Sequence, residues 1–427
     1  MKNHSNSDDL SCRPSQEDEI MILHQGMMAK GFEGVPKIES YTFSKGWSKD
    51  QVERLSPAVD SVVRANPVLT GKVFYKPGKI LCASLGAHPV GKHDFVTHIL
   101  LTDDEREKVP SGDSHEETMK FANEYLAPYV HHHQGTVGQE IEFSSPLFNV
   151  TMFHLKEDYF CYRVSMSHSL GDITTYYRLM EQISFALNGN EVAMKENALN
   201  WDNMSTHEMV PITYSKRDVS RSWGRAFRFG ANVVKGERTL SKRKVRRLLF
   251  SRDAISERKK IELDPSKHEF LSTNDILTSM VCKLSDCRLM MMNISTREKE
   301  AYPSRVNDAG NLFCAPHFNT KAGHDPNVIR SITTSVGGYF KPNRIPILPF
   351  LQGSVGTVSS WDRPKLIEGE KIANVCHFPG EFWFKGFALD FAIIYAVDEN
   401  CVGVLHNFLN SKDLQSLDIS DTLWDLK

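Results

Sequence analysis

The stretch from 159 to 190 constrains the fold more than any other part of the chain. Residues 159–167 are rich in aromatic and β-branched side chains, which predicts a strand. Apolar residues then recur at helical spacing over 173–187, and a Gly-Asn pair at 189–190 supplies a helix stop. The segment 168–172, His-Ser-Leu-Gly-Asp, is therefore the turn between a strand and a helix.

A histidine at the end of a strand can be presented to a cleft instead of being packed in a core. With an unperturbed pKa of about 6.5, His168 is mostly neutral near pH 7 and can take a proton from a hydroxyl or an amine. Asp172 could form a dyad with it. Alternatively, Asp172 could face away, with Gly171 bending the chain and an arginine holding the carboxylate. The residues alone leave both arrangements open.

The bulk properties narrow the class of protein. A length of 427 residues suggests two domains of ordinary size or one large two-lobed unit. Hydrophobic content of 40% and charged content of 24% are typical of a soluble globular protein, and a net charge of -2 does not favour nucleic acid as a partner. No apolar run reaches the roughly 18 to 20 residues of a membrane span, and the N-terminus lacks a signal-peptide core. These features predict a cytoplasmic protein.

The cysteines and histidines do not indicate a metal site. The eight cysteines include no C-x-x-C pair, so neither a disulfide framework nor a zinc site is predicted. Cys161 and Cys282 lie in apolar runs, which favours small buried thiols. The histidine triplet at 131–133 has no partners at ligand spacing and is predicted to be a solvated turn.

The residues around the turn resemble those of a known family. The run 146–172, PLFNVTMFHLKEDYFCYRVSMSHSLGD, is similar to the approach to the active-site histidine in the BAHD-type CoA-dependent acyltransferases. Their superfamily also contains the condensation domains of peptide synthetases, chloramphenicol acetyltransferase and carnitine acyltransferases. Further similar segments follow in the family's order: NPVLTGK (66–72), STNDILT (272–278), MNISTR (292–297), AGN (309–311) and VSSW (358–361). Their common order is more specific than any one segment.

The resemblance implies a fold. The expected class is α+β, with two chloramphenicol-acetyltransferase-like lobes, each a mixed sheet flanked by helices, and a solvent channel between them. The expected divisions are a disordered tail (1–17), an N-terminal lobe carrying the H-x-x-x-D turn (18–205), a basic crossover (206–260) and a C-terminal lobe (261–427).

The resemblance also implies a reaction. The expected activity is transfer of an acyl group, other than an aminoacyl group, from acyl-CoA to a small-molecule alcohol or amine by direct attack. His168 is the expected general base, the hydroxyl of Ser359 the expected oxyanion donor, and Trp361 and Asn311 are expected at the acceptor pocket. Acyl-CoA enters as a co-substrate, with no bound cofactor and no metal, and the protein is expected to be a monomer.

In the family, the aspartate of the turn points away from the site and pairs with an arginine. Here that arginine is Arg297, because Ser295 occupies the family's other arginine position. Asp172, Arg297 and Gly171 are therefore expected to have a structural role, fixing the turn that carries His168.

Two departures from the family's sequence pattern keep other functions open. Ile173 replaces the glycine that usually follows the aspartate, and no D-F-G-W-G segment follows Trp361. One alternative is a condensation-type transfer from a carrier-protein thioester. The other is a catalytically silent homologue of the same fold that binds a ligand or partner.

The segment 214–260 is rich in lysine and arginine and has few acids. Three interpretations stand: a solvated connector, a site for the phosphates of CoA, or a membrane-surface segment, because aromatic and apolar residues interleave with the cations. The sequence does not separate them.

Hydrophobic periodicity predicts the remaining elements. Strands are predicted at 37–43, 70–75, 79–84, 141–143, 148–154, 289–294 and 355–359, with an antiparallel pair at 387–397 and 401–405. Helices are predicted at 48–65, 116–126, 275–284, 329–340 and 411–417, and a loop at 103–113. Ser48 and Thr273 are the predicted N-caps of the helices that follow them.

Overall fold

The computed structural model describes most of both halves of the chain. The described residues are 19–25, 37–76, 79–84, 95–129, 147–168, 170–201, 243–298, 305–334, 355–380, 390–409 and 423–426. The predicted strand at 141–143, the predicted helix at 411–417, the histidine triplet and residues 214–242 of the basic stretch lie outside the described residues.

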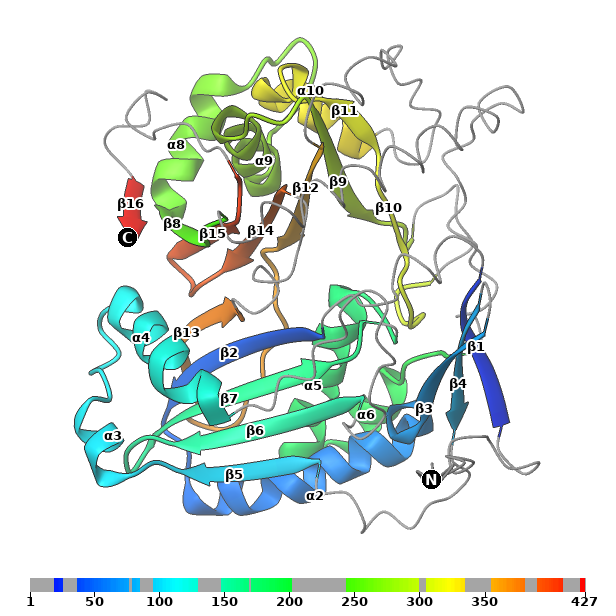
Figure 1. The fold of residues 1–427 in the computed structure, drawn as a ribbon, viewed down its shortest axis with the longest axis vertical. Helices are drawn as coiled ribbons and strands as arrows, with labels where there is room; N and C mark the ends of the chain where they lie inside the picture. Colours follow the sequence, from blue (N-terminus) through cyan, green and yellow to red (C-terminus); the bar gives the residue numbers. More distant parts are fainter. Residues whose placement is uncertain are drawn as a thin grey trace, which may run out of the picture.

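Two large mixed sheets organise the described residues (Figure 1). The first sheet has five strands in the order β13 (Ala373–Pro379), β2 (Ile38–Lys45), β7 (Tyr159–Met166), β6 (Phe148–His154) and β5 (Val96–Leu100). β5 and β6 are parallel and the other neighbours are antiparallel. The helices α2 (Lys49–Ala65) and α5 (Ile173–Leu187) run along one face of this sheet.

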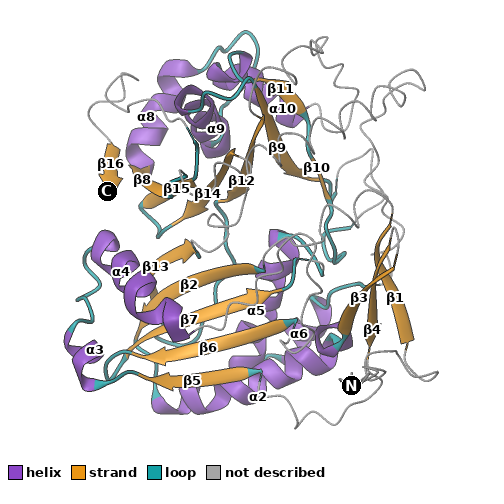
Figure 2. Cartoon of the chain, in the orientation of Figure 1, coloured by secondary structure: helices purple, strands orange, loops and turns teal. Residues whose placement is uncertain are grey.

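The second sheet has eight strands. Its order is β10 (Phe313–Cys314), β9 (Leu289–Ser295), β12 (Val355–Trp361), β14 (Asp390–Ala396), β15 (Cys401–His406), β8 (Arg246–Ser251) and β16 (Leu423–Leu426), and β11 (His317–Asn319) also pairs with β9. Three helices cover its outer side (Figure 2): α8 (Arg252–Glu262), α9 (Thr273–Leu284) and α10 (Pro326–Thr334).

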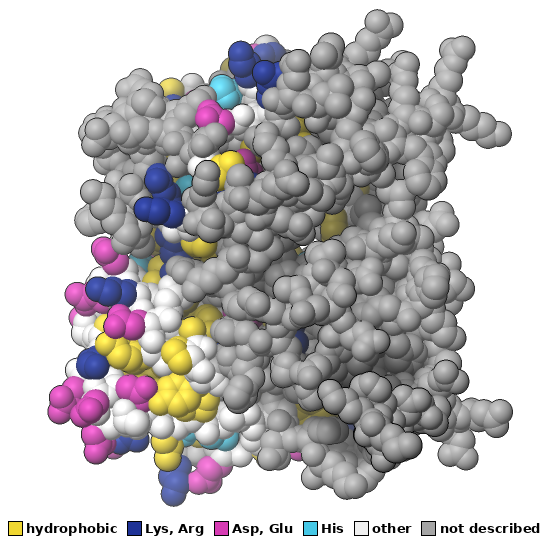
Figure 3. All heavy atoms as spheres, viewed as in Figure 1, with side chains coloured by type: hydrophobic (Ala, Val, Ile, Leu, Met, Phe, Trp, Pro, Cys, Tyr) yellow, Lys and Arg dark blue, Asp and Glu magenta, His cyan; other side chains and the backbone are white. Residues whose placement is uncertain are grey.

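Shorter elements complete the described part of the chain. A three-stranded sheet contains β1 (Glu19–Gln25), β4 (Lys79–Ser84) and β3 (Lys72–Lys76). The short helices are η2 (Pro67–Thr70), α3 (Asp103–Glu107), α4 (His115–Phe121), η3 (Ala122–Leu126), η4 (Ala127–Tyr129), α6 (Glu191–Glu196) and η6 (Ala322–His324). Figure 3 shows acidic and basic side chains interspersed over the described part of the face around α3 and α4.

The second sheet is buried on both faces. On β14, Ala392 and Ile394 belong to the apolar cluster formed with the helices of that sheet. Ile393 and Tyr395 belong instead to the cluster that contains the core of the first sheet. Because successive side chains of a strand point to opposite faces, one face of the second sheet packs on its own helices and the other faces the first sheet.

β13 is shared between the halves of the chain. It lies in sequence between β12 and β14 of the second sheet, yet it pairs with β2 at the edge of the first sheet. On β13, Phe378 is fully buried and stacks on Tyr41 of β2 with ring centroids 5.7 Å apart. The Arg247 guanidinium of β8 lies 4.9 Å from the centroid of the Phe378 ring. This ring therefore contacts residues of both sheets.

The predicted α+β class with two helix-flanked mixed sheets is confirmed. Within the expected crossover, β8 and α8 are part of the second sheet and its helical cover. The exact divisions of the chain at 205 and 260 stay a prediction.

The strands predicted around 37–43, 148–154, 159–167, 289–294, 355–359 and 401–405 are confirmed within one or two residues. The helix predicted at 48–65 is also confirmed. The Ser48 hydroxyl accepts from Gln51 N at 3.2 Å, and the Gln51 side chain accepts from Ser48 N at 3.0 Å. This reciprocal pair is a capping box, and it explains why the helix begins where it does.

Some local predictions were wrong. The N-cap of α9 is Ser272, not Thr273, because Ser272 forms a capping box with Asp275. The segment 103–113 is not entirely loop, since Thr102 and Glu105 form another capping box that starts α3. The first strand of the predicted hairpin begins at Lys72, because the residues before it form η2.

The helix predicted at 329–340 begins earlier than expected. α10 starts at Pro326, and residues 335–340 of the predicted span lie outside the described part of the chain.

Among the helices that the structure describes, none combines the length and the apolar character needed to cross a bilayer.

An ion pair joins α4 to the turn between β14 and β15. His115 Nε2 lies 2.9 Å from Asp398 Oδ2, and both side chains are largely buried. The hydrogen bond to Asp398, helped by one to Cys401, raises the pKa of His115 to about 9. His115 is therefore charged at neutral pH, and the pair links a helix over the first sheet to the β14–β15 turn of the second.

We expect His115→Gln to destabilise the protein in a pH-dependent way. The folded-state pKa of about 9 is above the ordinary value of 6.5, so the contribution is complete below about pH 6.5 and is lost as pH rises through about 9. Urea unfolding of wild type and variant across this range should give a stability difference that shrinks with rising pH. A difference that stays constant would contradict the expected charge on His115.

Candidate active site

The turn after β7 is shaped by the first turn of α5. Asp172 is the N-cap of α5, and its Oδ1 accepts a hydrogen bond from Thr175 N at 3.1 Å. A Cβ on Gly171 would lie 2.6 Å from Thr175 Cβ, closer than carbon atoms can approach. Only glycine lets the chain pass this close to the helix, so Gly171 sets the path of the turn that carries His168.

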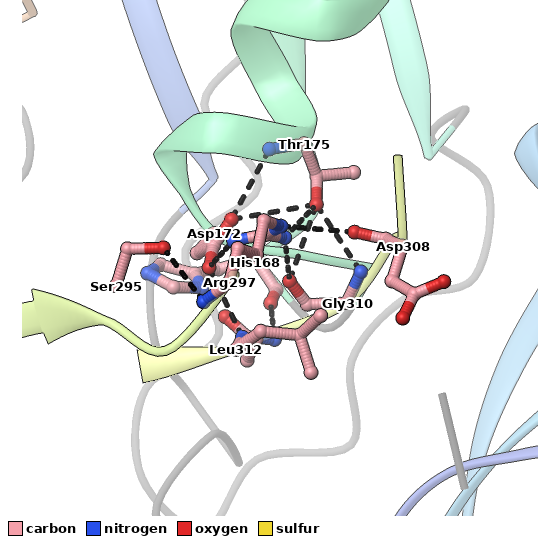
Figure 4. A network of polar contacts seen from close by, with 9 residues as sticks. His168, Asp172, Thr175, Ser295, Arg297, Asp308, Gly310 and Leu312 are labelled. Atoms are coloured by element: carbon pink, nitrogen blue, oxygen red, sulfur yellow. Dashed lines mark hydrogen bonds and ion pairs between the residues drawn. The ribbon is translucent and has the colours of Figure 1, made fainter. Parts of the chain in front are cut away.

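The Asp172 carboxylate pairs with Arg297 (Figure 4). Arg297 Nη1 lies 2.7 Å from Asp172 Oδ2, and the side chains are only 4% and 9% exposed. The same carboxylate oxygen accepts from Leu312 N at 3.0 Å. This is the ion pair that the resemblance implies. Of the two arrangements that the residues left open, the structure shows the one in which an arginine holds Asp172.

The guanidinium of Arg297 also donates hydrogen bonds to groups other than Asp172. Its Nε donates to Asp308 O at 3.0 Å, and its Nη2 donates to Thr175 Oγ1 at 3.0 Å and to Gly310 O at 3.1 Å. Arg297 therefore ties α5 to the segment 308–312, in addition to its pair with Asp172. This planar set of donors suits arginine, whose guanidinium presents several N–H groups in fixed directions.

Gly310 and Asn311 bring the second half of the chain to the histidine. Gly310 has a φ of 115°, a region that favours glycine, and its N donates to Thr175 Oγ1 at 3.1 Å. Its carbonyl accepts from Asp172 N at 3.2 Å. Asn311 Nδ2 then donates to His168 O at 2.8 Å. The main chain of the histidine turn is thus held from both halves of the chain.

The environment of His168 favours the uncharged imidazole. The residue is half-buried and its Nδ1 atom is buried. Burial lowers the pKa of His168, and this outweighs the opposing effects of a hydrogen bond to its own backbone, the Asp172 charge and a hydrogen bond to the Asn311 side chain. The imidazole is therefore neutral at pH 7, which is the form that can accept a proton.

Ser359 and Trp361 lie on β12, outside the network of Figure 4. In the parallel ladders, Ser359 is opposite Asn293 of β9 and Ile393 of β14. Since Ile393 belongs to the cluster that includes the first sheet, Ser359 points to the same side of the second sheet. Ser359 is partly exposed, whereas Trp361 is 5% exposed and packs in that cluster.

Sequence reasoning missed Thr175, Asp308 and Leu312. Thr175 stands three residues after the helix N-cap, where a capping contact is expected, so its involvement could have been found from the spacing. Asp308 and Leu312 contribute a main-chain carbonyl and a main-chain N–H. Such contributions do not depend on residue type, and no sequence signal identifies them.

Cys161 and Cys282 are buried, as predicted, and burial raises the pKa of both thiols. A protonated buried thiol is a poor nucleophile. Within the ranges that the structure describes, no group of three or more His, Cys, Asp or Glu side chains is arranged to hold a metal ion.

Comparisons with known proteins give matches in structure only. No family model matches the sequence, and no curated protein matches it. Among solved structures, TRI101 of F. graminearum in complex with coenzyme A and T-2 mycotoxin matches with a TM-score of 0.58 at 14% identity, covering 95% of this chain and 100% of that one.

Two further structures match over similar lengths. The first condensation domain of the CDA synthetase matches with a TM-score of 0.54 at 11% identity, covering 93% of each chain. Polyketide synthase associated protein 5 from Mycobacterium tuberculosis matches with a TM-score of 0.54 at 11% identity, covering 94% of this chain and 97% of that one. The chain has the chloramphenicol-acetyltransferase-like fold of these proteins, and the resemblance found in the sequence is confirmed at this level.

We expect Asp172→Asn to lower the free energy of unfolding by about 3 to 5 kcal/mol, because it leaves the Arg297 charge buried without its counter-ion. Urea unfolding measures this. Glu53→Gln is the matched control, since the Lys49–Glu53 pair is exposed and should cost less than about 1 kcal/mol. Equal effects of the two substitutions would show that the buried pair does not hold the turn.

Proposed function

We propose that the protein is an acyltransferase that moves an acyl group from acyl-CoA to the hydroxyl or amine of a small molecule. His168 acts as the general base and the acceptor attacks the thioester directly. The observation that carries the proposal is the neutral imidazole of His168, placed at a strand end and held from both halves of the chain in an acyltransferase-like fold.

The chemistry requires a group that deprotonates the acceptor as it attacks. A positioned base contributes about 10² to 10⁴ in rate. The lowered pKa of His168 supports this role, because the ring is unprotonated over the neutral range before the acceptor arrives. After the attack, the imidazolium can return the proton to the departing CoA thiolate.

The tetrahedral oxyanion needs a donor, and we assign this role to the Ser359 hydroxyl. Its place supports the assignment, since it is partly exposed and on the side of the second sheet that faces the first. One such donor is typically worth about 2.7 to 4 kcal/mol of transition-state stabilisation. Trp361, in the same strand and on the same side, would then limit the acceptor pocket.

The donor is proposed to be acyl-CoA. TRI101 of F. graminearum was crystallised with coenzyme A and with ethyl coenzyme A, and that similarity supports the proposal for this chain. We propose a monomeric, cytoplasmic enzyme with no bound cofactor or metal. Whether the basic stretch at 214–260 binds the phosphates of CoA, lies on a membrane or is only a solvated connector stays open, because most of it lies outside the described residues.

A second candidate is transfer from a carrier-protein thioester. The similarity to a condensation domain at a TM-score of 0.54 favours it, as does the missing D-F-G-W-G segment. Calorimetry with free CoA separates the two, because only an acyl-CoA enzyme needs to bind it. A silent binding homologue remains the third alternative, and turnover by the wild type would eliminate it.

We expect His168→Ala to reduce turnover by about 10² to 10⁴. The assay uses purified protein with a panel of acyl-CoAs and acceptors, and mass spectrometry identifies the product. His268→Gln is the control, because His268 hydrogen-bonds Asn327 and Ser331 of α10, away from the network of Figure 4. The proposal is abandoned if no pair of substrates gives turnover that depends on His168.

The pH profile is a separate test of the base. Because the pKa of His168 is lowered from 6.5, the acid limb of kcat/KM should lie below pH 6.5, and activity should persist into mildly acidic buffer. An acid limb above pH 7 would be inconsistent with His168 as the base in this environment.

A further inference from the structure

The main chain on both sides of Asn311 is fixed by hydrogen bonds. Gly310 is fixed by hydrogen bonds through its N–H and its carbonyl, as described above. On the other side, Leu312 N donates to Asp172 and Leu312 O accepts from Thr296 N at 2.9 Å. The main chain at Asn311 therefore has little freedom, and the direction of its side chain is determined by these anchors.

The Asn311 side chain is directed at the histidine. It is 9% exposed, and its Nδ2 donates to the carbonyl of His168 at 2.8 Å. The side chain of Asn311 also raises the pKa of the imidazole, against the larger effect of burial. A single side chain from the second half of the chain therefore holds the main chain of His168 and acts on the charge of its ring.

Asp172 does not make such a contact with His168. Its two carboxylate oxygens accept from Arg297, Leu312 and the N-terminus of α5. It acts on the imidazole only through the field of its charge. A direct side-chain hydrogen bond to His168 comes instead from Asn311.

We infer that Asn311 is a positioning residue of His168: by binding the carbonyl of His168, its carboxamide fixes the main chain from which the imidazole projects. The inference rests on the proposed function. In serine proteases an aspartate, and in papain-like enzymes an asparagine, orients the catalytic histidine through its ring, whereas here the carboxamide acts through the main chain. Because it is neutral, it adds no negative charge beside the ring, so the imidazole stays unprotonated near neutral pH.

The test compares substitutions at Asn311. Asn311→Ala removes the contact, and we expect kcat to fall by about 10- to 100-fold with little change in KM, since loss of ring orientation acts on the chemical step. Asn311→Asp places a carboxylate beside the ring. An adjacent negative charge favours the imidazolium, so the acid limb of the pH profile should move to higher pH.

A matched control lies on the same segment. Asn307→Asp introduces the same charge, but the Asn307 side chain bonds to Glu196 O at 3.4 Å. We expect it to leave kcat and the acid limb unchanged. Thermal melting of all variants checks folding, and Asn311→Ser, which retains a small polar side chain, replaces Asn311→Asp if the latter does not fold. Its kcat should fall between those of wild type and Asn311→Ala.

A readout without turnover separates this inference from the proposed function. The imidazole of His168 can be titrated by NMR in labelled protein, with His168→Gln assigning its signal. A higher pKa in Asn311→Asp, but not in Asn307→Asp, supports the inference whether or not a substrate is known. An unchanged titration, or an unchanged kcat in Asn311→Ala, overturns it, even if His168→Ala abolishes activity.

Discussion

The buried Asp172 carboxylate is the contact on which the rest of the site depends. It caps α5, pairs with Arg297 and accepts from the main chain at Leu312. Removing two charges from water is costly, and such a pair is retained only when its remaining hydrogen-bonding capacity is used. Here that capacity is used by groups from both halves of the chain, so the turn and the segment 308–312 are joined as one unit.

Two elements that are distant in sequence thereby meet at one histidine. The strand β7 brings His168 to the end of the first sheet, and the cap of α5 fixes where the turn ends. The segment that precedes β10 supplies the hydrogen bond to its carbonyl. The main chain of His168 is therefore held by groups from both halves of the chain. The shared strand β13 and the packing of the second sheet on the first support the same arrangement.

The part of the site that comes from β7, the turn and α5 could largely be predicted, because its sequence signals are local. Strand composition, helical spacing and the cap of α5 all lie within a few residues of His168. Local signals also account for the errors. Ser272 and Thr273 are both good caps, and only the reach of the Asp275 side chain selects the former. The capping box of Thr102 was present in the sequence, but the polar composition around it was interpreted as a loop.

By itself, the sequence determined many of the strands and helices and the turn that carries His168, because hydrophobic periodicity and capping act between near neighbours. The resemblance to a family added the fold of two lobes and Arg297 as the partner of Asp172. Only the tertiary structure decided that Asn311 contacts His168, that Thr175 joins Arg297 to Gly310, and that β13 completes the first sheet. Those contacts depend on which faces pack together and on main-chain groups that every residue possesses, and neither leaves a pattern along the chain.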